Sequence, residues 1–279
     1  MVRLTAYLAL PIGLVCTSPL RAQPHSVSRT DEIRRLSRQL HWANARESQD
    51  YERNKAAVTQ RLLKELDAFV EESFRPNGAT AEFVMQGLDS ALGYKNGDYR
   101  HNVAFVAALP TGLFLVAGIE VARGGSAIPE DAVSFRAYKA DESRLTLVAD
   151  SGVWENATGL YAKQLVSAPV KGEFWFLSSV ILTPSVSPPM VAIRLYAFDG
   201  AKFTVVWVPP DSRAQVCRNC VQATGPEDSF TVVADGFVVN KLFDPTGHAA
   251  GSPTIVIHDE FVITTEGPQK GKSWRTERR

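Results

Sequence analysis

The chain has no excess of charge of either sign, and this shortage excludes one large class of function. Its 279 residues contain 30 Lys and Arg against 30 Asp and Glu. Proteins that bind nucleic acids need a surplus of positive charge to neutralise the phosphates. We therefore predict that this protein has no nucleic-acid partner.

The sequence patterns that mark common catalytic and cofactor sites are also missing. The chain contains no G-x-S-x-G, S-x-x-K or H-E-x-x-H pattern and no glycine-rich loop of the kind that binds phosphate. We therefore predict no catalytic residue, no metal ligand and no cofactor. Whether the protein is an enzyme stays open, and the missing motifs favour a non-catalytic role.

The apolar run near the N-terminus is short. It covers residues 4–15, about a dozen, whereas a helix needs about 20 apolar residues to cross a bilayer. With Arg3 before the run, residues 1–22 are predicted to be a secretory signal peptide. A retained anchor and a lipid-modified Cys16 are the alternatives. We expect a secreted or periplasmic protein without a transmembrane anchor after processing.

Residues 23–97 are predicted to form a helical region. Its apolar residues recur at helical spacing: Ile33, Leu36, Leu40, Val58, Leu62, Leu66 and Phe69. The segment 44–54 between the two apolar runs is polar on nearly every face, so the helix either crosses solvent there or breaks into a hairpin. A further helix is predicted from Thr80 to Leu92. These helices are expected to pack on the rest of the chain or to join two copies as a homodimer.

Residues 98–269 are predicted to form a β-rich domain, because short runs of Val, Ile, Phe, Tyr and Thr alternate with clusters of Gly, Pro, Asp and Ser. The expected strands lie near 113–122, 132–140, 144–150, 159–166, 173–182, 191–199, 202–208, 229–243 and 254–265. The basic end, residues 270–279, is predicted to be a disordered, solvated tail.

The β region contains a candidate repeat. Residues 112–137 align without a gap with residues 172–197, at an offset of 60 residues. The stretch RLYAFDGAKFTVVW, at 194–207, resembles the outer hairpin of a propeller blade. The predicted fold is therefore mainly β with an N-terminal helical region (α+β). Its units are antiparallel β-meander repeats of about 60 residues, stacked like propeller blades or as a sandwich.

Cys217 and Cys220 are predicted to form a disulfide. A redox couple would need the first cysteine at the start of a helix, and a zinc site would need four ligands at a suitable spacing. Neither pattern surrounds this pair. Two neighbouring thiols in an oxidising compartment most simply join each other.

Aromatic residues in the expected strands are the candidates for ligand binding. Trp154, Tyr196 and Trp207 have flat rings that can stack on sugars or hold an extended peptide, and the alternative is that they pack in the core. Near the C-terminus, His258 and Glu260 should share one face of a strand while Asp259 points to the other.

Two functions remain open. The first is an exported, non-catalytic binding or structural module with a protein or carbohydrate partner. The second is an extracytoplasmic, carbohydrate-active hydrolase whose carboxylates come from separate loops, the candidates being Asp150, Glu155, Asp199 and Asp235. A flat binding surface would favour the module. A deep pocket with two facing carboxylates would favour the hydrolase.

Overall fold

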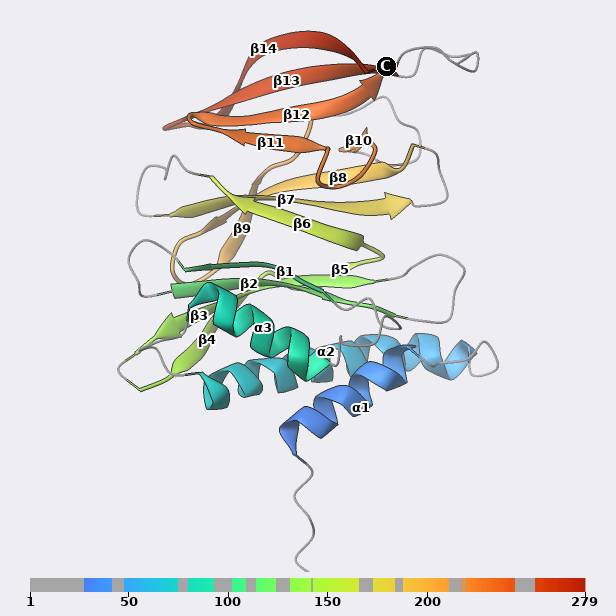
Figure 1. The fold of residues 1–279 in the computed structure, drawn as a ribbon, viewed down its shortest axis with the longest axis vertical. Coiled ribbons are helices and arrows are strands. Elements are labelled where there is room, and N and C mark those ends of the chain that lie inside the picture. Colours follow the sequence, from blue (N-terminus) through green and yellow to red (C-terminus); the bar gives the residue numbers. More distant parts are fainter. Residues whose placement is uncertain are drawn as a thin grey trace, which may run out of the picture.

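The protein stacks a layer of helices and three antiparallel β-sheets (Figure 1). A computed structural model describes residues 28–41, 48–74, 80–92, 102–108, 114–123, 131–141, 143–165, 173–183, 188–210, 217, 219–243 and 254–278. The expected signal peptide at 1–22 lies outside the described residues. The prediction of a mainly β fold with N-terminal helices is confirmed.

The helical layer contains α1 (Arg29–His41), α2 (Ser48–Ser73) and α3 (Ala81–Leu92). The helices α1 and α2 run antiparallel, because Arg29 at the start of α1 binds Glu65 and Glu72 near the end of α2, at 2.5 and 2.6 Å. The hairpin alternative for the polar segment is therefore the observed one. None of the helices in the described ranges is long and apolar enough to span a bilayer.

The strands form three separate sheets. Sheet A contains β1 (Asn102–Ala108), β2 (Phe114–Val121), β3 (Ala132–Ala140), β4 (Leu145–Asp150) and β5 (Trp154–Glu155). Sheet B contains β6 (Thr158–Gln164), β7 (Phe174–Thr183), β8 (Met190–Phe198), β9 (Phe203–Trp207) and β10 (Cys220–Gln222). Sheet C contains β11 (Phe230–Val233), β12 (Gly236–Phe243), β13 (Thr254–Thr264) and β14 (Gly267–Arg278). Across these described strands, none of the sheets closes on itself.

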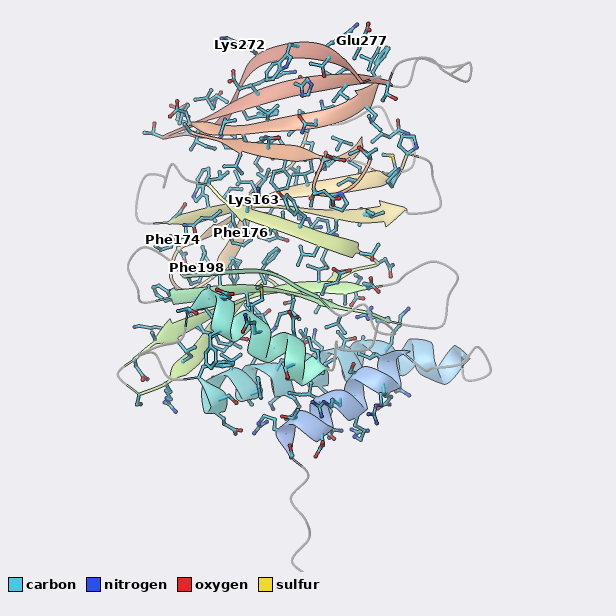
Figure 2. All side chains as sticks on the ribbon, in the orientation of Figure 1. Lys163, Phe174, Phe176, Phe198, Lys272 and Glu277 are labelled. Atoms are coloured by element: carbon cyan, nitrogen blue, oxygen red, sulfur yellow. A yellow bond between two sulfur atoms is a disulfide. The ribbon has the colours of Figure 1, made fainter. Side chains whose placement is uncertain are left out.

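Alternation along the strands produces three apolar layers. In β2, Leu115 and Ile119 face the helices, whereas Val116 faces sheet B. In β8, Tyr196 faces sheet A and Leu195 faces sheet C. Each large apolar side chain buried in this way contributes about 1.5–3 kcal/mol to the free energy of unfolding. Figure 2 shows the labelled Phe176 and Phe198 between sheets A and B.

One buried ion pair joins the helical layer to sheet A. Asp67 of α2 binds the guanidinium of Arg136 in β3 through both carboxylate oxygens, and the hydroxyl of Tyr138 donates to the same carboxylate at 2.8 Å. Asp67 and Arg136 are 7% and 6% exposed. Burial removes the hydration of both charged groups, so each needs the opposite charge of the other to offset the cost of desolvation.

Substitution of Asp67 tests this dependence. Asp67→Asn keeps the shape but leaves Arg136 buried without a counter-charge, so the free energy of unfolding should fall by about 3–5 kcal/mol. The control Glu72→Gln removes the exposed partner of Arg29 and should cost under about 1 kcal/mol. Urea denaturation measures both values, and equal losses would contradict the assignment.

The C-terminal residues differ from the predicted disordered tail at 270–279, because β14 extends from Gly267 to Arg278. Asp259 of β13 gives this basic strand a buried acidic partner, forming ion pairs with Lys241 and Lys270. The hydroxyl of Ser273 donates to Asp259 at 2.7 Å. Burial opposes ionisation of Asp259, but Lys241, Ser273 and Lys270 together lower its pKa to about 2. The tail is therefore ordered by pairing with β13.

Candidate functional site

The three aromatic residues singled out from the sequence lie at sheet interfaces. Tyr196 is 3% exposed and stacks on Phe176, so its ring is not available to an external ligand in this structure. Trp154 is half-buried, with the guanidinium of Arg194 3.6 Å from its ring centre. Trp207 is also half-buried and packs edge-on against Phe237 and Phe261 of sheet C.

The four loop carboxylates are distributed over all three sheets. Asp150 ends β4 in sheet A and accepts a hydrogen bond from the amide of Gly152 at 2.8 Å. Glu155 of β5, also in sheet A, forms an ion pair with Arg123. Asp199 follows β8 of sheet B, and Asp235 lies in the turn between β11 and β12 of sheet C. No hydrogen bond among the described residues joins any two of these four carboxylates.

Two other carboxylates, missed by the sequence analysis, do come together. Glu120 of β2 and Asp131 before β3 are 3% and 2% exposed. Thr158 donates to both, at 3.3 Å to Glu120 and 2.5 Å to Asp131. Burial, opposed by hydrogen bonds from two backbone amides and reinforced by Asp131, raises the pKa of Glu120 to about 7. A raised pKa beside a second carboxylate is what a general acid needs.

The contacts of this acidic pair nevertheless favour a structural role. Glu120 accepts the amides of Gly159 and Leu160 at 2.7 and 2.9 Å, and Asp131 accepts the amide of Arg123 at 3.3 Å. Both carboxylates are thus committed to holding the backbone, and both are buried. A catalytic carboxyl must instead reach a substrate.

The outer face of sheet C is the candidate functional site. Apolar residues of the inner face, such as Phe237 and Phe261, pack on sheet B. Cross-strand partners share a face, so Asn240, His258 and Trp274 form one row across β12, β13 and β14 on the opposite side. Figure 1 shows this side of sheet C at the end of the stack away from the helices.

The row is joined by hydrogen bonds whose directions follow from one another. The amide nitrogen of Asn240 donates to the carbonyl of Asp228 at 2.9 Å, which turns its oxygen toward His258. His258 Nδ1 therefore donates to Asn240 Oδ1 at 2.8 Å. His258 Nε2 lies 2.7 Å from the hydroxyl of Thr276, which accepts a hydrogen bond from a protonated Nε2 and donates one to an unprotonated Nε2. The result is a fixed row of an amide, an imidazole and a hydroxyl.

Trp274 provides the exposed aromatic surface of this face. Its side chain is 41% exposed, and its ring stacks on that of His258 with the centroids 5.1 Å apart and the planes 17° from parallel. Val233 and Val262, 37% and 38% exposed, lie on the same face of the sheet because both pair with Gly236. In Figure 2 the labelled Lys272 and Glu277 mark this outermost strand.

A small hollow adjoins the row. It is lined by Ala223, Thr224, Asp228, Asn240, Leu242 and Val256. Its volume of about 10 Å³ is near the minimum for one water molecule, so it cannot hold a ligand of any size. The candidate site is therefore an open surface, and the hollow beside it is only a shallow recess.

Strand alternation predicts His258 and Glu260 on one strand face and Asp259 on the other, and the cross-strand contacts have that arrangement. Trp274 was not predicted as a site residue, because 270–279 were expected to be disordered. One signal was present: Thr265 and Glu266 form the turn between β13 and β14, and Gly267, the first residue of β14, has φ 110°, where glycine is favoured.

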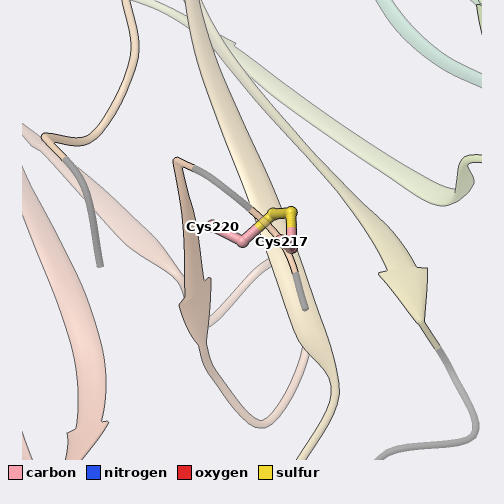
Figure 3. Close-up of a disulfide and its surroundings, with 2 residues drawn as sticks. All are labelled: Cys217 and Cys220. Carbon is pink, nitrogen blue, oxygen red and sulfur yellow. A yellow bond between two sulfur atoms is a disulfide. The ribbon is translucent and has the colours of Figure 1, made fainter. Parts of the chain in front are cut away.

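The cysteine pair lies at the edge of sheet B (Figure 3). Cys217 and Cys220 are at disulfide distance, with their Cα atoms 5.6 Å apart, as the sequence predicts. Cys220 begins β10 and is fully buried. The bond therefore links Cys217 to the first residue of β10.

Reduction of this bond should have a small effect on stability. The disulfide closes a very short loop, for which chain entropy predicts a stabilisation of only about 2 kcal/mol. Wild-type protein treated with a thiol reductant should therefore remain folded and unfold at slightly lower urea concentration. Circular dichroism through a urea series measures the difference. Complete unfolding on reduction would show that the bond has a larger structural role.

No protein-family model matches this chain, and no curated protein is significantly similar to it in sequence. The case for a function therefore depends on the geometry described above.

Proposed function

We propose that the protein is an exported, non-catalytic binding module that holds a neutral carbohydrate on the outer face of sheet C. The observation that carries this proposal is the exposed ring of Trp274 beside the row of Asn240, His258 and Thr276. An aromatic ring can stack on the apolar face of a sugar, and amide, imidazole and hydroxyl groups can exchange hydrogen bonds with its hydroxyls.

The charge of the face favours a neutral ligand. The row itself contains no formal charge when His258 is neutral, and the backbone amide of Lys272 donates to Glu260 beside it. Lys241 and Lys270 are paired with Asp259. Lys270 and the other basic residues of the edge strand β14 discourage pairing with a foreign strand. An extended peptide added to this edge is therefore the weaker alternative.

Export is part of the proposal. The predicted signal peptide motivates it. A disulfide, together with the finding that no helix in the described residues is both long and apolar enough to span a membrane, is compatible with an extracellular location. The helical layer has a charged outer surface with ion pairs such as Arg35 with Glu32 and Arg61 with Glu32. This polar surface offers little apolar area for the expected homodimer through the helices, which stays a hypothesis.

A repeated β-meander is the proposed structural unit of the module. The aligned segments both contain an antiparallel hairpin, β2–β3 and β7–β8. The next turns are also alike, because Asp141 accepts the amides of Ser143 and Arg144 and Asp199 accepts those of Ala201 and Lys202. The hairpin registers differ by one residue, since Leu115 pairs with Tyr138 but Trp175 with Ala197.

Affinity electrophoresis tests the binding function. Gels containing dextran, galactomannan or laminarin should retard the wild-type protein in at least one case. Trp274→Ala should weaken that binding by about tenfold or more, as for a central aromatic contact. Phe83→Ala is the matched control, because Phe83 is 56% exposed on α3 at the opposite end of the molecule.

Two outcomes would contradict the proposal. One is wild-type migration that no polysaccharide changes, and the other is equal retardation of Trp274→Ala and wild type. Light scattering on the same samples adds a third, because a dimer that Trp274→Ala dissociates would assign the face to a second copy of the chain.

A further inference from the structure

The acidic pair Glu120 and Asp131 lies where the chain passes from sheet A to sheet B. This crossing, residues 156–160, comprises the link from β5 to β6 and the first residues of β6, and it contains Asn156 and Gly159 in the left-handed region, at φ 55° and 67°. The pairing of β6 with β7 shifts register between Thr158 and Tyr161, so the intervening amides leave the ladder. Those amides, of Gly159 and Leu160, need other acceptors.

Glu120 and Asp131 supply the acceptors for the whole crossing. Glu120 accepts both freed amides, at 2.7 and 2.9 Å. Asp131 accepts the hydroxyl of Thr158 at 2.5 Å, and its backbone carbonyl accepts the amide of Ala157 at 3.0 Å. The two acids thus attach strand β6 of sheet B to the end of β2 and the start of β3 in sheet A.

Few charges compensate the pair. Arg123 contacts Asp131 only through its backbone amide, while its guanidinium binds Glu155 and the hydroxyl of Thr59 in α2. Strands β1 and β7 contain no titratable residue, and Arg136 of β3 faces Asp67. On β6, the ammonium group of Lys163 lies over the ring of Tyr161. Glu227 comes directly after Pro226 in the sequence, and the ring of Pro226 lies near Gly159. No described cation is bonded to either carboxylate of the pair.

We propose that Glu120, buried beside Asp131, carries a proton in the folded protein and acts as a pH-dependent clasp between sheets A and B, which loosens when that proton is lost. Two buried carboxylates without a cation repel each other when both are ionised. Burial and the nearby Asp131 raise the pKa of Glu120 to about 7, opposed by the two amides. The folded protein therefore binds the proton more strongly than the unfolded chain, and stability falls as pH rises from about 4.5 toward 7.

Amide hydrogen exchange measures the clasp at its own bonds. In the wild-type protein, protection of the Gly159 and Leu160 amides, corrected for intrinsic exchange, should fall by about tenfold or more between pH 5.5 and 8.5. Protection of the Leu177 amide, in the center of β7, should change much less. Protection at Gly159 and Leu160 that is constant across this range would overturn the proposal.

Glu120→Gln provides the matched variant, because an amide resembles the protonated acid in shape and in having one donor and one acceptor side. Its one oxygen can accept only one of the two backbone amides, and the protection of that amide should be the same at pH 5.5 and at pH 8.5. Glu155→Gln, which removes the nearby partner of Arg123, should retain the wild-type pH dependence. A pH dependence that persists in Glu120→Gln would also overturn the proposal.

If Glu120→Gln fails to fold, the wild-type protein still decides the question. Carbon-13 NMR of the labelled Glu side-chain carboxyls follows the titration of Glu120 directly, with assignment from the network of bonds to Gly159 and Leu160. A titration near neutrality supports the clasp. A titration at the ordinary value for glutamate, or none between pH 5 and 9, contradicts it.

Discussion

Sheet A and sheet B are apolar on both faces, and this constraint determines the order of the layers. A sheet with two apolar faces must be covered twice, so sheet A lies between the helices and sheet B, and sheet B lies between sheets A and C. The helices end the stack on one side because they combine an apolar stripe with a charged outer surface. The other end of the stack is the outer face of sheet C.

That outer face differs from the inner faces in a way that favours binding. The strands of sheet C direct Phe237 and Phe261 toward sheet B, whereas His258 and Trp274 lie on the opposite side. A side chain as large as Trp274 gains little stability where it is half exposed. Its place beside a fixed row of hydrogen-bonding groups is the basis of the proposed carbohydrate binding. The acidic pair between sheets A and B differs from this row, because its carboxylate oxygens already accept hydrogen bonds from backbone amides.

Much of the fold could be predicted from periodicity, and the exceptions have physical reasons. The apolar stripe of α2 and the apolar runs of β7 and β8 predict where these elements lie to within a few residues of their observed bounds. Strands β5 and β10 contain two and three residues, too few for a pattern. Strand β14 is polar along its length and depends on Asp259 of the preceding strand for its order.

The candidate site was harder to predict than the fold. Its row comes from three strands, and only the register shows that Asn240, His258 and Trp274 are neighbours. The pairing of Glu120 with Asp131 likewise depends on the register of β2 with β3, in which Val121 pairs with Ala132, and sequence spacing does not reveal this register. The aromatic residues that spacing did suggest, such as Tyr196, were drawn into the interfaces because sheets need large apolar residues there.

Hydroxyl-radical footprinting tests most directly whether the stack ends in an open face at sheet C. The account predicts that Trp274, 41% exposed, is oxidised much faster than Trp175, which is 8% exposed between sheets B and C. Mass spectrometry of the peptides gives both rates in one sample. Equal protection of the two tryptophans would show that the outer face of sheet C is covered, and would contradict the account.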